Sequence, residues 1–197
     1  MNSYNDLLSQ VLYDLEDCSR NSALLALRQA GRAFCKATNI WVENVETKLN
    51  FSGEEDNYEI SPIGDSFIQH IVALQINGDE IPKTSYSLND DWSFEFTNEF
   101  VKQNYIYDGE KITLQVVLRP RFDADILSRN FLQRYAEPII AKARSILYSQ
   151  SSKSYFNLDV AESCLAVYKE WVDATCLTTC SDNNGENMHV EQLGNVW

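Results

Sequence analysis

Apolar residues recur with two different spacings along this chain. Over residues 4–16 and 23–41 they return every three or four positions, which predicts two helices. Between residues 41 and 119 the spacing falls to two, as in strands with one wet face. Helical spacing resumes over residues 128–150 and 157–174. This order predicts an α+β protein: a four-helix body made of two helical hairpins, with an inserted antiparallel β-domain.

Short polar residues precede the predicted helices. Asn21 or Ser22 is suited to cap the second helix, Ser128 the third and Asn157 the fourth. Pro138 lies inside the third helix, where it should bend the helix or mark its true start. The residues that the fourth helix should direct inward are Val160, Cys164, Val167, Tyr168 and Trp171.

Two turn sequences organise the central segment. Asn77-Gly78 and Asp108-Gly109 are hairpin signals, because these residue types tolerate positive φ. Six or seven strands joined by tight turns predict an antiparallel sandwich or small barrel. Alternation places Trp92, Phe94 and Phe96 on one side of a strand, which favours a core over a sugar-binding platform. We therefore expect a helical body over 1–40 and 121–176, an inserted β-domain over 41–120 and an extended tail over 177–197.

The second helix carries three stripes. The large apolar stripe consists of Leu24, Leu27, Gly31, Phe34 and Cys35. The stripe of methyl groups consists of Ala23, Ala26, Ala30, Ala33 and Ala37. The basic stripe consists of Arg28, Arg32 and Lys36. Two interpretations are open: a core helix with a solvated basic stripe, or a helix whose alanine and basic stripes pack against a second copy.

Charge is segregated along the chain. The formal net charge is −13, which argues against a protein that grips nucleic acid through its phosphates. Residues 1–40 hold four acids and four bases, and residues 121–176 hold seven of each. Residues 41–120 hold fifteen acids against five bases, and residues 177–197 hold three acids and no base. The β-domain and the tail therefore carry the whole excess.

The composition also indicates a compartment. Five cysteines, an odd number without a framework spacing, indicate reduced thiols in a protein made in a cytoplasm. No run of eighteen apolar residues and no signal-peptide pattern occur, so we expect no membrane partner.

Signatures of common enzymes are missing from the sequence. There is no G-x-S-x-G, no H-E-x-x-H and no phosphate-binding glycine loop. His70 lies in a strand, and Cys176, Cys180 and His189 are one ligand short of a structural zinc site. The carboxylate groups Asp90-Asp91 and Glu54-Glu55-Asp56 lie in predicted turns, where acids are usually solvated. We expect no enzyme activity, cofactor or metal.

Three stretches resemble a family of phage head-to-tail connector or adaptor proteins, most clearly those of short-tailed phages. They are ALRQAGRAFCKATNIW (Ala26–Trp41), RYAEPIIAKARSIL (Arg134–Leu147) and SKSYFNLDVAESCLAVY (Ser152–Tyr168). In this family such helices flank an all-β segment of about eighty residues. The resemblance covers residues 20–175 and carries no catalytic residue.

The resemblance implies a structural virion protein of the phage neck. Such proteins form a ring, commonly of twelve copies, that joins the portal protein to a tail nozzle or other tail proteins. The packaged DNA passes through the ring without specific binding, and like charge on the acidic β-domain fits such a conduit. A tail that docks on the portal is known in related adaptors, so the implied docking residues are His189, Val190, Leu193, Val196 and Trp197.

Two alternatives remain from the sequence. One is a cell-wall lytic tail protein that uses acids among Glu54, Glu55, Asp90 and Asp91. The other is a host-surface-binding tail protein that acts through its β-domain.

Overall fold

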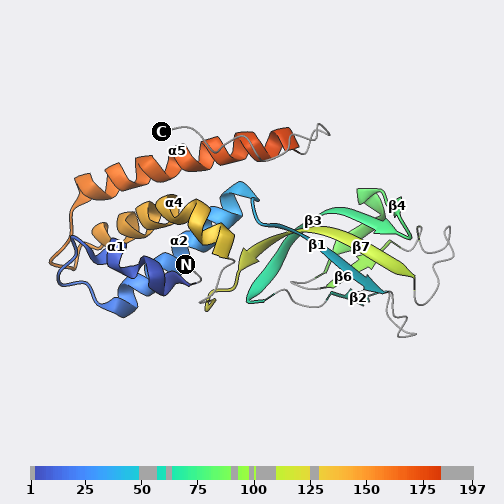
Figure 1. Ribbon diagram of the computed structural model, residues 1–197, viewed down its shortest axis with the longest axis horizontal. Helices are drawn as coiled ribbons and strands as arrows, with labels where there is room; N and C mark the ends of the chain where they lie inside the picture. Colours follow the sequence, from blue (N-terminus) through green and yellow to red (C-terminus); the bar gives the residue numbers. More distant parts are fainter. Residues whose placement is uncertain are drawn as a thin grey trace.

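The computed structural model describes residues 3–48, 57–60, 64–89, 93–97, 100, 110–124 and 129–182 of the chain. It confirms the predicted α+β class, with helices and antiparallel sheets in the described residues. Figure 1 shows the helices gathered at one end of an elongated molecule and the strands at the other. None of the described helices is long and apolar enough to cross a membrane.

The helical body contains four α-helices and one short 3₁₀ helix among the described residues. Their bounds are η1 Tyr4–Leu7, α1 Leu8–Leu12, α2 Arg20–Thr38, α4 Arg129–Tyr148 and α5 Leu158–Asp182. The first predicted helix, over residues 4–16, is thus shorter than expected and begins as a 3₁₀ turn. In Figure 1, α4 lies between α5 on one side and the α1 and α2 region on the other.

Helix α2 begins one turn earlier than its sequence predicts. Ser19 is the N-cap, and its Oγ accepts a hydrogen bond from the backbone N–H of Ser22 at 3.1 Å. The predicted caps Asn21 and Ser22 are therefore wrong, because Ser19 already satisfies the first turn. The helix ends at Asn39, whose φ of 54° is a left-handed cap and whose N–H donates to the Cys35 carbonyl.

The proline prediction for α4 is confirmed. Tyr135 has φ −117° and ψ 23°, so the helix is kinked three residues before Pro138. Pro138 then lies in the first turn of the straight segment, where its missing N–H breaks no hydrogen bond.

Asn157 caps α5 as predicted, since its Oδ1 accepts from the Val160 N–H at 3.2 Å. The helix extends beyond the predicted end near residue 174, to Asp182. The expectation that Val167 faces inward is wrong, because this side chain is 37% exposed.

The β-domain consists of two antiparallel sheets in the described residues. The four-stranded sheet has the order β1-β7-β3-β4, and the three-stranded sheet has the order β2-β6-β5. The strand bounds are β1 Val42–Lys48, β2 Asn57–Glu59, β3 Ser66–Ile76, β4 Asp79–Glu80, β5 Tyr86–Leu88, β6 Ser93–Phe96 and β7 Lys111–Pro120, with the 3₁₀ helix η2 Lys83–Ser85 before β5. The Asn77-Gly78 hairpin joins β3 to β4 with φ of 52° and 96°, as expected, while Asp108-Gly109 lies outside the described residues.

Strand β3 carries a register shift that matters for the surface described below. Its pairing with β7 shifts between Ile68 and His70, so Gln69 is left without a cross-strand partner. Gln69 instead turns to the end of α2, where its Nε2 donates to Asn39 Oδ1 at 2.8 Å and to the Lys36 carbonyl at 3.3 Å. The bulge therefore ties the four-stranded sheet to the helical body.

Each region has its own hydrophobic core. In the body, Phe34 is fully buried and packs against rings of α4 and α5. In the β-domain, Phe94 and Phe96 are buried as predicted, and Trp92 lies outside the described residues. Trp41 packs against both clusters, at the point where the chain passes from one region to the other.

Candidate interaction surface between α2 and the sheet

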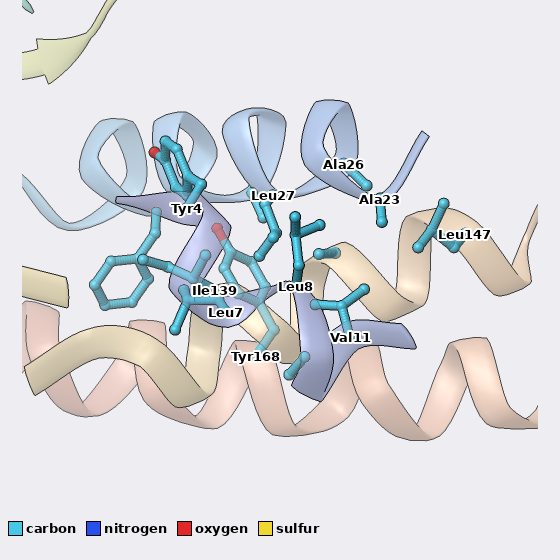
Figure 2. Packing of buried hydrophobic residues seen from close by; sticks show 14 of the residues in the cluster. Tyr4, Leu7, Leu8, Val11, Ala23, Ala26, Leu27, Ile139, Leu147 and Tyr168 are labelled. Atoms are coloured by element: carbon cyan, nitrogen blue, oxygen red, sulfur yellow. The ribbon is translucent and has the colours of Figure 1, made fainter. Parts of the chain in front are cut away.

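The alanine stripe of α2 is largely covered inside the chain. Ala23, Ala26 and Ala30 are 0%, 2% and 0% exposed. Figure 2 shows Ala23 and Ala26 facing the inside of the body, close to Leu8 and Leu147. The prediction that these three alanines pack against a second copy is wrong, because the N-terminal segment and α4 already fill the space beside them.

The rest of that stripe lies nearer to solvent. Ala33 is half-buried and Ala37 is exposed at the end of α2. A neighbouring segment of the same chain reaches Ala37, since the Cys176 thiol on α5 donates to its carbonyl oxygen at 3.4 Å. The face of α2 that remains open is the basic one.

The close packing beside the alanines also explains Gly31. A Cβ at this position would collide with the hydroxyl and ring of Tyr4, which lies across the helix. Tyr4 is fully buried, and burial raises the pKa of its phenol well above the usual range. Burial similarly raises the pKa of the Cys35 thiol, so both groups are neutral parts of the core.

The predicted basic stripe faces outward and meets the sheet. Arg28 and Arg32 are half-buried, and Lys36 is exposed. The guanidinium carbon of Arg32 lies 5.8 Å from the centre of the Phe67 ring on β3. This contact joins the helical body to the four-stranded sheet beside the Gln69 hydrogen bonds.

Two further arginines surround the same ring. The guanidinium carbons of Arg119 and Arg121 lie 5.6 and 5.3 Å from the Phe67 ring centre. We call Arg32, Arg119 and Arg121, gathered around Phe67, the arginine cluster. Each contact is a cation–π interaction, which offsets part of the cost of keeping a guanidinium away from water.

Strand pairing explains the cluster. Phe67 is the direct cross-strand partner of Arg119 in the β3–β7 ladder, so their side chains share a face. Arg121 follows two residues later, and its N–H donates to the Asp65 carbonyl, which continues the pairing beyond Pro120. Alternation then returns the Arg121 side chain to the same face.

Few described acids neutralise the arginine cluster. Arg121 forms an ion pair with Asp123 at 3.7 Å, and both side chains are largely exposed, so the pair contributes little. Within the described ranges, neither Arg32 nor Arg119 has an ion-pair partner. The Nε of Arg119 and the Oε1 of Gln69 are buried without a hydrogen-bond partner among the described residues.

A shallow groove runs between α4 and α5. It has a volume of about 630 Å³, and its apolar lining includes Ile140, Val167 and Trp171. Arg134 and Arg144 lie at its edges, and Arg144 is bound to Asp14 at 3.0 Å. Of the α5 residues that the sequence assigned to the core, Cys164, Val167 and Trp171 thus line this groove, while Tyr168 is buried in the core as predicted.

The remaining sequence candidates are His70, the possible zinc ligands and the acids of the predicted turns. His70 is on the exposed side of β3, where partial desolvation and Lys83 lower its pKa. Among the described residues no group of His, Cys, Asp and Glu could hold a metal ion. The acids Glu54, Glu55, Asp56, Asp90 and Asp91 lie outside the described residues.

The tail residues His189, Val190, Leu193, Val196 and Trp197 also lie outside the described residues, so their docking role stays a prediction. No family model matches the chain, and no curated protein matches it.

Sequence reasoning found one member of the arginine cluster and missed the others. Arg32 was recognised from its helical spacing, but Phe67, Arg119 and Arg121 come from two other segments. The available signal was the sequence Arg119-Pro120-Arg121, because two arginines two positions apart at the end of a strand share a face.

Proposed function

We propose that this protein is a structural connector of the phage neck, which assembles as a ring between the portal protein and the tail. The ring is expected to hold twelve copies and to surround the passage that DNA takes during genome ejection. The protein is made in the host cytoplasm, and its function resides in surfaces, without enzyme activity.

One observation carries the proposal: the stretches that resemble connector proteins coincide with the helices that build one body. Ala26–Trp41 covers most of α2 and ends directly before β1, and Arg134–Leu147 lies on α4. Ser152–Tyr168 leads into α5. The helices follow one another along the chain in the order expected from the resemblance, with the β-domain between α2 and α4, and α2, α4 and α5 contact one another.

The charge distribution agrees with a DNA conduit. Residues 41–120 carry ten more acids than bases, and the described exposed acids of this region include Asp79 and Glu80 on β4. A wall with the same sign as the phosphates lets DNA slide without adhering.

The proposal is tested with the product of a neighbouring portal gene. The two purified proteins are mixed and imaged by negative stain, and the expected result is a ring seated on one face of the portal. The absence of binding, together with the absence of any portal or capsid gene beside this one, would overturn it.

The tail is tested separately. A chain that ends at Asp182 should keep its thermal unfolding midpoint and lose affinity for the portal, and Trp197→Ala should weaken binding less. The matched control is Phe156→Ala, which removes an exposed aromatic ring, 44% accessible, from the loop before α5. Undiminished binding by the shortened chain would exclude the tail as the docking element.

A further inference from the structure

The arginine cluster brings together three positive charges that the described part of the chain balances only in part. All three guanidinium carbons lie within 5.8 Å of one ring centre, and among the described residues only Arg121 forms an ion pair, with Asp123. Like charges held this close repel one another, and cation–π contact with one ring returns only part of that cost. The arrangement therefore favours an anion at this position.

The three guanidinium groups offer hydrogen-bond donors as well as positive charge. Carboxylates accept two parallel hydrogen bonds from a guanidinium, which makes them well suited to a cluster of arginines.

Exposed apolar residues near the cluster favour a protein partner. The Phe122 ring, directly after Arg121, is 56% exposed, and Leu25, about two turns before Arg32 on α2, is 40% exposed. Arginines with exposed aromatic rings are typical of protein interfaces. A nucleic acid would also meet the overall charge of −13, which opposes a polyphosphate.

We propose that the arginine cluster binds carboxylates on the β-domain of a second copy of this chain. The same chain supplies the complementary charge, because residues 41–120 hold fifteen acids against five bases. Among the described ones, Asp65, Asp79, Glu80 and Glu95 are exposed. This inference depends on the proposed ring and identifies one of its contacts.

The contact is heterologous, since a basic junction on one copy meets an acidic surface on the next. Contacts of this type close into rings when the rotation between copies allows it. The interface therefore uses Arg32 of the basic stripe together with the ends of the central strands β3 and β7, in place of Ala23, Ala26 and Ala30, which are covered from within the chain.

The test uses the full chain with Arg32→Gln and Arg119→Gln combined, and Arg121→Glu as a second variant at an exposed position. Arg134→Gln is the matched control, because Arg134 is an exposed arginine that lies 5.5 Å from the Tyr135 ring, away from the cluster. Native mass spectrometry and analytical ultracentrifugation measure multimers of the protein alone and on the portal, at low and high salt. Thermal midpoints identify any variant that fails to fold.

We expect wild type and Arg134→Gln to form multimers that high salt weakens, and both cluster variants to associate about tenfold or more weakly. The proposal is overturned if wild type stays monomeric both alone and on the portal, or if the cluster variants form the same multimers. Wild type that binds duplex DNA through these arginines and remains monomeric also overturns it. If the protein forms salt-sensitive multimers through these arginines but does not bind the portal, the proposed function is contradicted and the contact between copies is still supported.

Discussion

The helical body and the β-domain bury their aromatic residues in different ways. In the body, Phe34 of α2 contacts Phe131, Tyr135 and Tyr168, which follow the β-domain in the chain. In the β-domain, Tyr58 contacts Phe94 and Phe96 on the adjacent strand β6. The core of the body can therefore close only after the whole insertion has been made, whereas the core of the β-domain joins segments nearer in sequence.

The two regions also differ in what they leave for partners. The body has balanced charge and covers Ala23, Ala26 and Ala30 from within, while the β-domain carries an excess of acids. Small side chains on one helix face thus indicate close packing but do not identify the molecule that packs there. The positive charge at the junction says more about a partner, because the described part of the chain neutralises it only in part.

The largest expected losses of stability come from removing one buried ring in each of the two cores. Phe34→Ala and Phe94→Ala each remove a fully buried ring, at a cost of about 3–5 kcal/mol in the free energy of unfolding. Urea titration measures this loss. Hydrogen exchange locates it, and we expect Phe34→Ala to speed exchange first in α2 and α4, and Phe94→Ala first in β2, β5 and β6.

The two cores are not separate units if each variant speeds hydrogen exchange equally in both regions. That result would make the molecule one cooperative unit, coupled through Trp41. Phe156→Ala is the control, because its ring is 44% exposed and its removal should leave exchange in both cores unchanged.

Substituting one glycine in each region should give the next largest losses of stability. In the body, Gly31→Ala places a Cβ within 3.0 Å of the Tyr4 ring carbons, and overpacking of this kind costs about 2 kcal/mol. In a Tyr4→Ala background the clash is gone, and the same change should be neutral or stabilising by up to about 1 kcal/mol from helix propensity. Chemical denaturation of the four chains measures the coupling, and additive losses would contradict this cause.

Gly78 in the β-domain should behave differently. Nothing lies within 4 Å of its added Cβ, but its φ of 96° disfavours other residues. Gly78→Ala should cost about 1–2 kcal/mol through the backbone alone. No substitution of a neighbouring side chain should restore the loss, and thermal unfolding of Gly78→Ala with and without Asp79→Ala, the next residue of the hairpin, checks this.

The sequence predicted regular elements well where a single segment determines them. The Asn77-Gly78 turn joins β3 to β4 as its residue types suggest, and Asn157 caps α5 as its side-chain chemistry suggests. Pro138 also acts as expected, since a missing N–H has the same effect in any surroundings.

Features that depend on contacts between segments were not predictable in this way. The helical spacing of Ala23, Ala26 and Ala30 shows a narrow face but does not identify its neighbour, which proved to be inside the chain. The arginine cluster depends on the register that pairs Phe67 with Arg119, and no local pattern fixes that register. Ser19, Asn21 and Ser22 can each cap a helix by their side-chain chemistry. Only the path of the backbone determines which of them is the N-cap of α2.

The smallest expected effect concerns the hydroxyl of Tyr4. This buried oxygen has no hydrogen-bond partner among the described residues, so Tyr4→Phe should stabilise the protein by up to about 1 kcal/mol at neutral pH. Burial raises the pKa of Tyr4 above its unfolded value of about 10. The stability that depends on the protonated Tyr4 phenol is therefore fully present below pH 10. It is lost as the pH rises further, because the unfolded chain releases the phenol proton first.

Tyr4→Phe should accordingly make the fall in unfolding free energy above pH 10 less steep. Part of the decline should remain, because burial also raises the pKa of the Cys35 thiol and of phenols such as Tyr135 and Tyr168, which are unchanged in the variant. Urea titrations between pH 7 and 11 measure both parts, with Tyr13→Phe as the control because its ring is 82% exposed. If Tyr4→Phe keeps the wild-type slope above pH 10, the Tyr4 phenol is not sealed in the core of the body, and the tight contact inferred between Tyr4 and Gly31 is wrong as well.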